Sequence, residues 1–385
     1  MMNKKYINFS KPLFGTEEEK SVNQVLKSGW LTTGLITKKF ENKFKKYKKS
    51  KYALALNSCT AALHLSLQLL NLKKDDEVIT SALTFSSTIN SIIITGARPV
   101  LADVDITTQN IDPFEIEKKI TKKTKAILIV HFAGLACDMD KILFLTKKYN
   151  LHLIEDCAHA IEGQFKKKNL GTFGTFGCFS FYATKNLSIG EGGMLITNNK
   201  KLYDRARILS LHGMDKAAWN RYGKSGYRHY DVSEVGYKYN LMDLLSAIGI
   251  EQLKKLEKNY KIRENLWKTY ANNFAKKGFV FPYNWSKTKI KHSYHLFNLY
   301  LEKKRDGISR DEAISELHKK KIGVGIHYKA IPEHSIYKKL FKWNINNYPN
   351  AKKIGRQTIS LPLSPSLKKL EILKVVKSIN KITCK

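Results

Sequence analysis

The sequence lacks the features of membrane-embedded and disulfide-stabilised proteins. Its 385 residues contain no run of about 18 apolar residues, which a membrane-spanning helix requires. Residues 1–15 carry lysines without a continuous apolar stretch, so they do not have the pattern of a signal peptide. The five cysteines are irregularly spaced and form no Cys-x-x-Cys pair, which argues against a disulfide framework and a zinc ribbon. Together these absences predict a cytoplasmic protein with no membrane partner.

Metal-binding and nucleic-acid-binding motifs are also missing. Neither a His-Glu-x-x-His segment nor a tight cluster of His, Cys and Asp occurs in the sequence, so we expect no metal site. Acidic residues are scarce: 33 Asp and Glu face 68 Lys and Arg, which gives a formal charge of +35. Such a charge favours a phosphate-rich partner, either nucleic acid or an anionic substrate. The lysines, however, are spread along the whole chain without aromatic interleaving, which favours a solvated surface and no nucleic-acid partner.

Short apolar runs alternate with longer helical patterns between residues 52 and 198. The runs are almost continuously apolar, as strands buried on both faces should be, and the alternation with helices is typical of a mainly parallel sheet. The expected strands are 52–56, 77–81, 98–103, 125–132, 151–155, 177–182 and 193–197. The expected helices between them are 60–70, 87–95, 112–120 and 138–149.

The pattern becomes helical after residue 200, at 203–211 and 241–264. A smaller α+β portion then follows, with expected strands at 295–301 and 324–328 and a helix that begins after Ser309. Ser309 and Glu312 have the spacing of a capping box. We therefore predict an α/β protein with a large domain, residues 1–257, and a small C-terminal domain, residues 258–385.

Polar residues follow several of the expected strands, at the edge where an open parallel sheet binds its ligands. The segment after the first strand, residues 57–63, opens a helix with Ser58, Cys59 and Thr60, and a helix start of this kind can bind an anion. A plain Ser/Thr cap without a ligand explains the same pattern. Asp156 ends another buried strand, where a lone carboxylate is costly unless it meets a donor or caps the next turn.

The strand at 177–182 leads to Ser180 and Lys185 at its carboxyl end. A mostly buried lysine has a lowered pKa and can act as a nucleophilic amine, although a surface lysine is common in so lysine-rich a chain. Residues 190–194 (Gly-Glu-Gly-Gly-Met) predict a tight turn into the last strand, with the backbone close to a neighbour. A phosphate anchor, a carboxylate and a lysine in this order are the groups that pyridoxal 5'-phosphate (PLP) requires.

At these residues the chain resembles the DegT-type family of sugar aminotransferases, which have the PLP fold type I of aspartate aminotransferase. Within the family, the likeness is greatest to members that form UDP-4-amino-4-deoxy-L-arabinose. The resemblance covers nearly the whole chain. The segments that carry it are 156–160, 179–181 with Lys185 and Asn186, 191–193, 236–241, 325–328 and 361–363.

The resemblance implies how the cofactor would be held. Lys185 would bind its aldehyde and act as the catalytic residue, and Asp156 would bind the pyridinium nitrogen. Further cofactor contacts would come from residues at the phosphate and the ring: Cys59, Thr60 and Ser180 at the phosphate, and Phe85 stacked on the ring. An aromatic residue after a strand is also often part of the core, and this is the alternative to stacking for Phe85.

The resemblance also implies how the rest of the pocket is built. His159 would line it beside the cofactor, and His327 would contact the sugar. Asn240 would reach the phosphate of the neighbouring subunit, which implies a homodimer with shared sites. Arg228 and Lys329 are candidates for binding a substrate diphosphate, although ordinary surface charge is the commoner explanation for each.

The activity implied is transfer of an amino group, from glutamate, to a nucleotide-linked 4-keto sugar in the biosynthesis of amino sugars such as those of lipopolysaccharide. Cys59, Cys157 and His159 depart from the residues most common in the family, which affects the shape of the pocket. Two alternatives remain at this stage. A dehydratase of the same family has histidine in place of the lysine, whereas this chain keeps Lys185. A non-catalytic nucleic-acid-binding regulator would need neither the lysine nor the aspartate.

Overall fold

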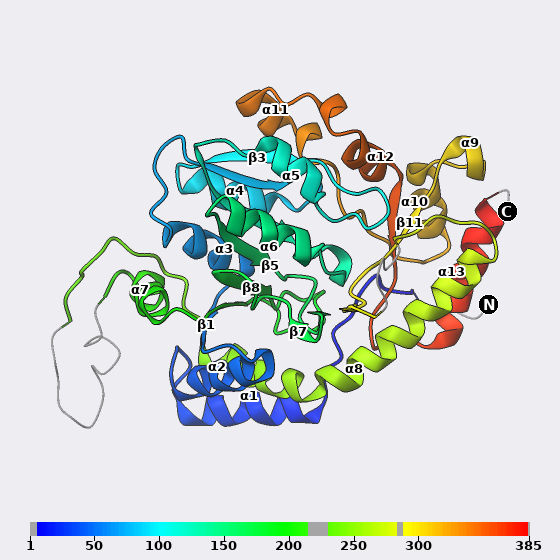
Figure 1. Ribbon diagram of the computed structural model, residues 1–385. Coiled ribbons are helices and arrows are strands. Elements are labelled where there is room, and N and C mark those ends of the chain that lie inside the picture. The colour runs from blue at the N-terminus through cyan, green and yellow to red at the C-terminus, as the bar shows by residue number, and fades with distance from the viewer. Residues whose placement is uncertain (1–5, 215–229, 283–287, 384–385) are drawn as a thin grey trace.

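A seven-stranded sheet forms the centre of the larger part of the chain (Figure 1). The computed structural model describes residues 6–214, 230–282 and 288–383. The strand order is β1-β9-β8-β5-β4-β2-β3, and only the pairings of β9 with β1 and β8 are antiparallel. This confirms the mainly parallel sheet. The strands are β1 (Tyr52–Leu56), β2 (Glu77–Ser81), β3 (Arg98–Ala102), β4 (Thr124–Val130), β5 (His152–Asp156), β8 (Phe176–Ser180) and β9 (Gly193–Thr197).

Helices cover both faces of this sheet, and alternate side chains of each strand serve the two faces. On β4, Ile127 and Ile129 belong to the core beneath α2, α6 and α8, whereas Ala126 and Leu128 belong to the core beneath α3 and α7. The helices of this part are α1 (Thr16–Ser28), α2 (Leu35–Lys48), α3 (Cys59–Gln68), α4 (Ser86–Ile94), α5 (Pro113–Lys119), α6 (Met139–Lys148), α7 (Lys200–Ser210) and α8 (Asp243–Ala275). A small sheet of β6 (Gln164–Phe165), β7 (Lys168–Asn169) and β10 (Ile290–Lys291) lies at the margin.

The C-terminal part has a second apolar core around a two-stranded antiparallel sheet. Ser309 caps α10 with Glu312 in the predicted capping box. The predicted strand at 324–328 is wrong: this segment makes only an isolated bridge, from Gly325 to Ser360. The side chains of His327 and Tyr328 bond instead to Ser360 and His159. The elements are α9 (Lys303–Asp306), α10 (Arg310–Lys319), α11 (Ser335–Phe341), α12 (Pro349–Gln357), α13 (Lys369–Ile382), β11 (Phe297–Tyr300) and β12 (Thr358–Leu361).

The long helix α8 connects the two cores, from α1 and α2 at one end to α13 at the other (Figure 1). Leu256 packs in the core of the large sheet and Leu266 in the C-terminal core. The predicted domain boundary after residue 257 therefore falls inside a continuous helix, and Ile7 also packs in the C-terminal core. Among the described residues no helix combines the length and apolar character needed to cross a membrane.

Candidate active site

Lys185 and Asp156 lie together at the carboxyl edge of the sheet. Asp156 ends β5, and Lys185 follows the neighbouring strand β8. Burial lowers the pKa of the Lys185 amine to about 8, and the charge of Asp156 is the largest influence that opposes this lowering. Burial likewise raises the pKa of Asp156, and the Lys185 charge is among the influences that lower it. Asp156 is buried and Lys185 is partly buried, so the predicted carboxylate and lysine influence each other's charge at this edge of the sheet.

The Asp156 carboxylate has few partners among the described residues. Its Oδ1 accepts the backbone N–H of Ala158 at 3.0 Å, and its Oδ2 is 3.4 Å from the Thr88 hydroxyl. A carboxylate has about four acceptor positions, so Asp156 retains capacity for another donor. The bond to the Ala158 N–H fits the interpretation of Asp156 as a cap of the next turn. The remaining acceptor positions fit the interpretation of Asp156 as the partner of another donor.

The first turn of α3 forms an edge of the same site. Ser58 caps the helix, because its Oγ accepts the Ala61 N–H at 3.0 Å. The N–H groups of Cys59 and Thr60 have no partner within the helix at this terminus, so they can bind an anion. β9 passes very close to this turn: a Cβ added to Gly193 would lie 2.4 Å from the Ser58 carbonyl carbon, so only glycine fits there. Cys59 is buried, and Thr60 is exposed.

Phe85 is not a core residue, because 56% of its surface is exposed. Its ring lies 5.7 Å from that of Tyr328, which belongs to the segment that carries His327. Ser180, at the end of β8, is half-buried, and its Oγ accepts the Tyr182 N–H at 3.3 Å. An exposed aromatic ring at the end of a strand suits contact with a planar ligand better than it suits core packing.

His159 lies in a group of stacked rings next to Lys185. Its ring is 4.4 Å from that of His295 and stacks on Tyr328 at 6.0 Å. The Nδ1 atom of His159 accepts the Ala133 N–H at 3.3 Å, so the proton of the neutral ring is on Nε2. That Nε2–H donates to the Tyr328 hydroxyl oxygen at 3.1 Å, which leaves the hydroxyl proton of Tyr328 available to another acceptor. Burial, followed by the Lys185 charge, holds the pKa of His159 well below its usual range.

His327 is held by a buried chain of hydrogen bonds. The Ser360 hydroxyl donates to the Asn298 side-chain oxygen at 2.7 Å, so it accepts from His327 Nδ1 at 2.8 Å. Asn298 in turn donates to Gln109 at 3.0 Å. This arrangement leaves Nε2 of His327 as a hydrogen-bond acceptor. Burial lowers the pKa of His327 to about 3, so the ring is neutral at ordinary pH.

Three further residues were predicted for the site: Asn240, Arg228 and Lys329. The side chain of Asn240 donates to the Thr33 hydroxyl of its own chain at 2.6 Å, next to the end of β1. Arg228 lies outside the described residues. Lys329 lines a groove of about 790 Å³ together with Arg310 and Trp343.

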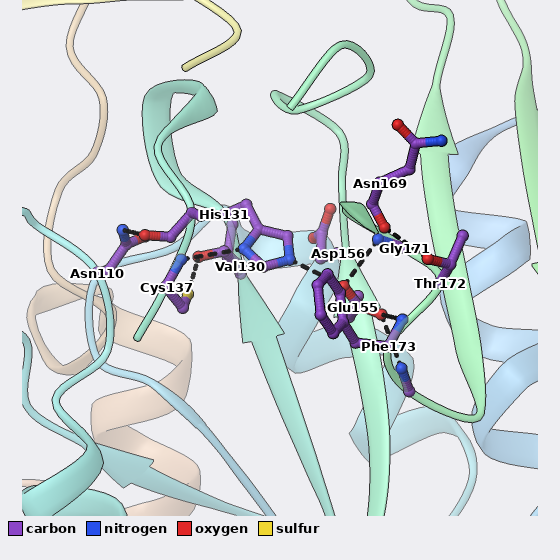
Figure 2. Close-up of polar contacts among 12 residues, drawn as sticks. Asn110, Val130, His131, Cys137, Glu155, Asp156, Asn169, Gly171, Thr172 and Phe173 are labelled. Atoms are coloured by element: carbon purple, nitrogen blue, oxygen red, sulfur yellow. Dashed lines mark hydrogen bonds and ion pairs between the residues drawn. The ribbon is translucent and has the colours of Figure 1, made fainter. Parts of the chain in front are cut away.

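Glu155 and His131 form a buried polar pair next to Asp156 (Figure 2). Both are fully buried, and Glu155 also accepts backbone N–H groups from the loop at 171–174. With Cys157 they form a tight His/Glu/Cys cluster that the sequence did not reveal. Glu155 already accepts four hydrogen bonds, so its lone pairs are engaged within the protein and leave little for a cation.

Several site residues were not singled out from the sequence. Thr88 on α4 contacts Asp156, and His295 stacks on His159. Tyr328 was noted only within the family-like segment 325–328, although its hydroxyl is bonded to His159. No local pattern marks these residues, because each meets its partner from a distant part of the chain.

Comparisons with known proteins identify the family of the chain. The model of the DegT/DnrJ/EryC1/StrS aminotransferase family matches residues 12–380. The chain is 43% identical to the spore coat polysaccharide biosynthesis protein SpsC of Bacillus subtilis (strain 168) over 379 residues, which is 98% of this chain and 97% of SpsC.

Solved structures agree over nearly the full length. The PMP form of Spr1654 from Streptococcus pneumoniae is 31% identical with a TM-score of 0.90, and the alignment covers 98% of each chain. Spr1654 has also been solved in a PLP form. Helicobacter pylori PseC, an aminotransferase involved in the biosynthesis of pseudoaminic acid, is 29% identical with a TM-score of 0.91, over 98% of this chain and 99% of PseC. The fold is therefore PLP fold type I, and the chain belongs to the DegT/DnrJ/EryC1/StrS family as a PLP-dependent sugar aminotransferase.

Proposed function

We propose that this aminotransferase moves the amino group of L-glutamate to a nucleotide-linked 4-keto sugar, and that the aminated sugar enters a surface polysaccharide. The observation that carries the proposal is the placement of the partly buried Lys185 and the buried Asp156 together at the carboxyl edge of the sheet. SpsC is named for spore coat polysaccharide biosynthesis, and PseC is involved in the biosynthesis of pseudoaminic acid, which supports a sugar substrate here.

The donor set of the site fits PLP. Asp156 has unused acceptor capacity for a protonated ring nitrogen, and the α3 terminus offers the N–H groups of Cys59 and Thr60 to a phosphate. The Ser180 hydroxyl would add a phosphate contact, and the exposed ring of Phe85 would cover a face of the cofactor. When bound, PLP supplies an electron sink for breaking the Cα–H bond of the amino donor.

Lys185 would perform the proton transfers of the reaction. With its pKa lowered to about 8, a substantial fraction of the amine is neutral near physiological pH and can accept a proton from the donor's Cα. The resulting ammonium can return the proton, so one residue acts as base and then as acid. Asp156 would accept the N–H of the protonated ring nitrogen at its unused acceptor positions. Asp156 is buried and Lys185 is partly buried, and this limited contact with water strengthens the interaction of their charges.

The acceptor sugar would meet neutral hydrogen-bonding groups. Nε2 of His327 would accept a hydrogen bond from a sugar hydroxyl, and the Tyr328 hydroxyl would donate a hydrogen bond to a sugar oxygen. His159 holds the Tyr328 hydroxyl in place through the hydrogen bond from its Nε2–H. Amination at C4 is the position that we propose. A 4-keto pentose, as in UDP-4-amino-4-deoxy-L-arabinose formation, and a 4-keto-6-deoxyhexose differ by one methyl group, and a pocket separates such substrates by only about 1–3 kcal/mol.

The proposal also includes a cytoplasmic homodimer. Asn240 would reach the phosphate site of the partner, and Arg228 and Lys329 would draw the diphosphate of the substrate to the rim. A dehydratase of the same family is less well supported, because Lys185 is present where a dehydratase has histidine.

Kinetics with a substrate panel test the proposal. The purified enzyme, loaded with PLP, is assayed with L-glutamate and a set of UDP- and dTDP-linked 4-keto sugars, and 2-oxoglutarate release is measured. We expect kcat/KM for at least one nucleotide-linked 4-keto sugar to exceed that for free sugars and 2-oxo acids by at least about 100-fold. Equal turnover of free sugars or simple 2-oxo acids would refute the substrate class.

A further inference from the structure

The side chain of Asn186, directly after Lys185, is bonded at every polar position. Its Nδ2 donates to Glu162 Oε2 at 2.9 Å and to the Ser293 carbonyl oxygen at 3.0 Å. Its Oδ1 accepts from His295 Nδ1 at 2.9 Å. A primary amide has two N–H donors and one oxygen, so all three are used. The orientation of Asn186 is therefore fixed on three sides.

Behind Asn186 lies a buried ion pair. Glu162 bonds to Arg263 on α8, and the two side chains are 0% and 1% exposed. The Nε and Nη1 atoms of Arg263 have no hydrogen-bond partner within the described ranges. Glu162 is thus the acid that compensates this buried guanidinium, while its second oxygen serves Asn186. Removal of one member of such a pair leaves an uncompensated buried charge.

The position of Arg263 ties this arrangement to the rest of the fold. Arg263 lies on α8 between Leu256 in the core of the large sheet and Leu266 in the C-terminal core. The same guanidinium lines a small cavity together with Lys185 and Asn186. The segment that carries Lys185 is therefore anchored to the helix that joins the two cores.

We propose that Asn186, Glu162 and Arg263 form a positioning clamp that fixes the backbone of Lys185 and thereby the direction of its amine. The inference rests on the role of Lys185 in the proposed function. A lysine has a long, flexible stem, so the place of its amine depends on how firmly the backbone is held. The Lys185 N–H bonds to the Tyr182 carbonyl at 2.9 Å on one side, and the clamp holds Asn186 on the other. With the clamp broken, the amine reaches water.

The amine of Lys185 in the cofactor-free protein reports the state of the clamp. The rate at which an amine-selective acylating reagent modifies Lys185 is followed against pH by peptide mass analysis. Asn186→Ala removes all three hydrogen bonds of the Asn186 side chain without changing any charge. We expect the pH at which the modification rate is half of its maximum, the midpoint, to rise by about one unit. The reason is that the amine moves from a buried site toward water, which raises its pKa. An unchanged midpoint in a folded variant would overturn the clamp.

Glu162→Gln separates release of the lysine from simple electrostatics. Loss of a carboxylate near a lysine, by charge alone, lowers the lysine pKa, whereas release into water raises it. We expect the midpoint pH of Lys185 modification to rise in this variant too, so a lower midpoint would contradict the proposal. Thr80→Val is the matched control, because it deletes a buried hydroxyl that bonds to Leu128 in the sheet, away from Lys185. Its midpoint should equal that of the wild type.

Two further measurements distinguish the clamp from the role of Lys185 itself. Borohydride reduction of the PLP-loaded wild type, with peptide mapping, shows which lysine holds the cofactor; a label on another lysine would refute the proposed role of Lys185 and leave the clamp measurement intact. With the label on Lys185, the clamp predicts that Asn186→Ala lowers kcat at least about tenfold with little change in the KM of the acceptor. Equal kcat in wild type and variant would count against the clamp alone.

Discussion

Glu155→Gln is expected to destabilise the protein strongly, because Glu155 accepts four hydrogen bonds in the interior. Figure 2 shows its contacts with His131 and with the loop that contains Gly171 and Phe173. Oε2 accepts Gly171 N–H at 2.7 Å and His131 Nε2 at 3.1 Å, and Oε1 accepts the N–H groups of Phe173 and Gly174 at 2.7 and 2.8 Å. In glutamine one of these oxygens becomes an NH2 group, which faces two donors. A hydrogen bond to a charged group contributes about 1.5–3 kcal/mol, so the loss of two predicts about 3–6 kcal/mol.

Urea unfolding of the cofactor-free protein, followed by tryptophan fluorescence, measures this loss. Glu257→Gln is the matched control: it is the same substitution at a side chain that is 54% exposed and contacts Lys291 at the surface. The control should cost less than about 1 kcal/mol. If Glu155→Gln lowered the free energy of unfolding no more than Glu257→Gln does, the account of the four hydrogen bonds would be wrong.

Three other perturbations test separate parts of the site. Asp156→Asn should preserve the fold and lower kcat at least about 100-fold, because an amide does not hold a pyridinium proton as a carboxylate does; near-normal turnover would exclude the assigned role. Lys185→Ala and Asn240→Ala should each be inactive, yet mixed subunits should regain activity if Asn240 acts across a dimer; no gain despite demonstrated subunit exchange would place Asn240 in its own subunit. Burial lowers the pKa of Lys48 to about 8 from its ordinary 10.5. Between these pH values the unfolded chain binds more protons than the folded one, so stability rises with pH. Lys48→Met should flatten that rise in urea titrations at pH 8 and 10, and an unchanged slope would contradict the lowered pKa.

The sheet was predictable because its strands are short apolar runs bounded by polar residues. All seven predicted strands of the large sheet were found within two residues at each end. The segment 324–328 has similar composition but pairs only through Gly325, and its side chains His327 and Tyr328 turn to the site instead. β11 pairs with β12. This pairing depends on tertiary packing, so the local sequence pattern does not predict it.

The site was predictable where a residue follows a strand, as Lys185 and Asp156 do. Contacts that join distant segments were not. Asn186 and Glu162 are 24 residues apart, and Glu162 and Arg263 are 101 apart. No periodicity relates residues at such separations, and a glutamate in a turn or an arginine on a helix is ordinarily a surface group. Only the fold shows that both are buried and paired.

The charge of the pocket differs from that of the surface, and this difference bears on the substrate. The chain carries a formal charge of +35, yet three histidines beside Lys185 are neutral. Burial, with the Lys185 charge as the next influence, lowers the pKa values of His159, His295 and His327. A pocket of neutral rings binds hydroxyl groups by hydrogen bonds and does not demand a charged sugar. The positive surface, in contrast, attracts anions before they enter. A substrate with a neutral keto sugar and an anionic diphosphate matches both environments, which favours a nucleotide-linked sugar over a free sugar or a small oxo acid.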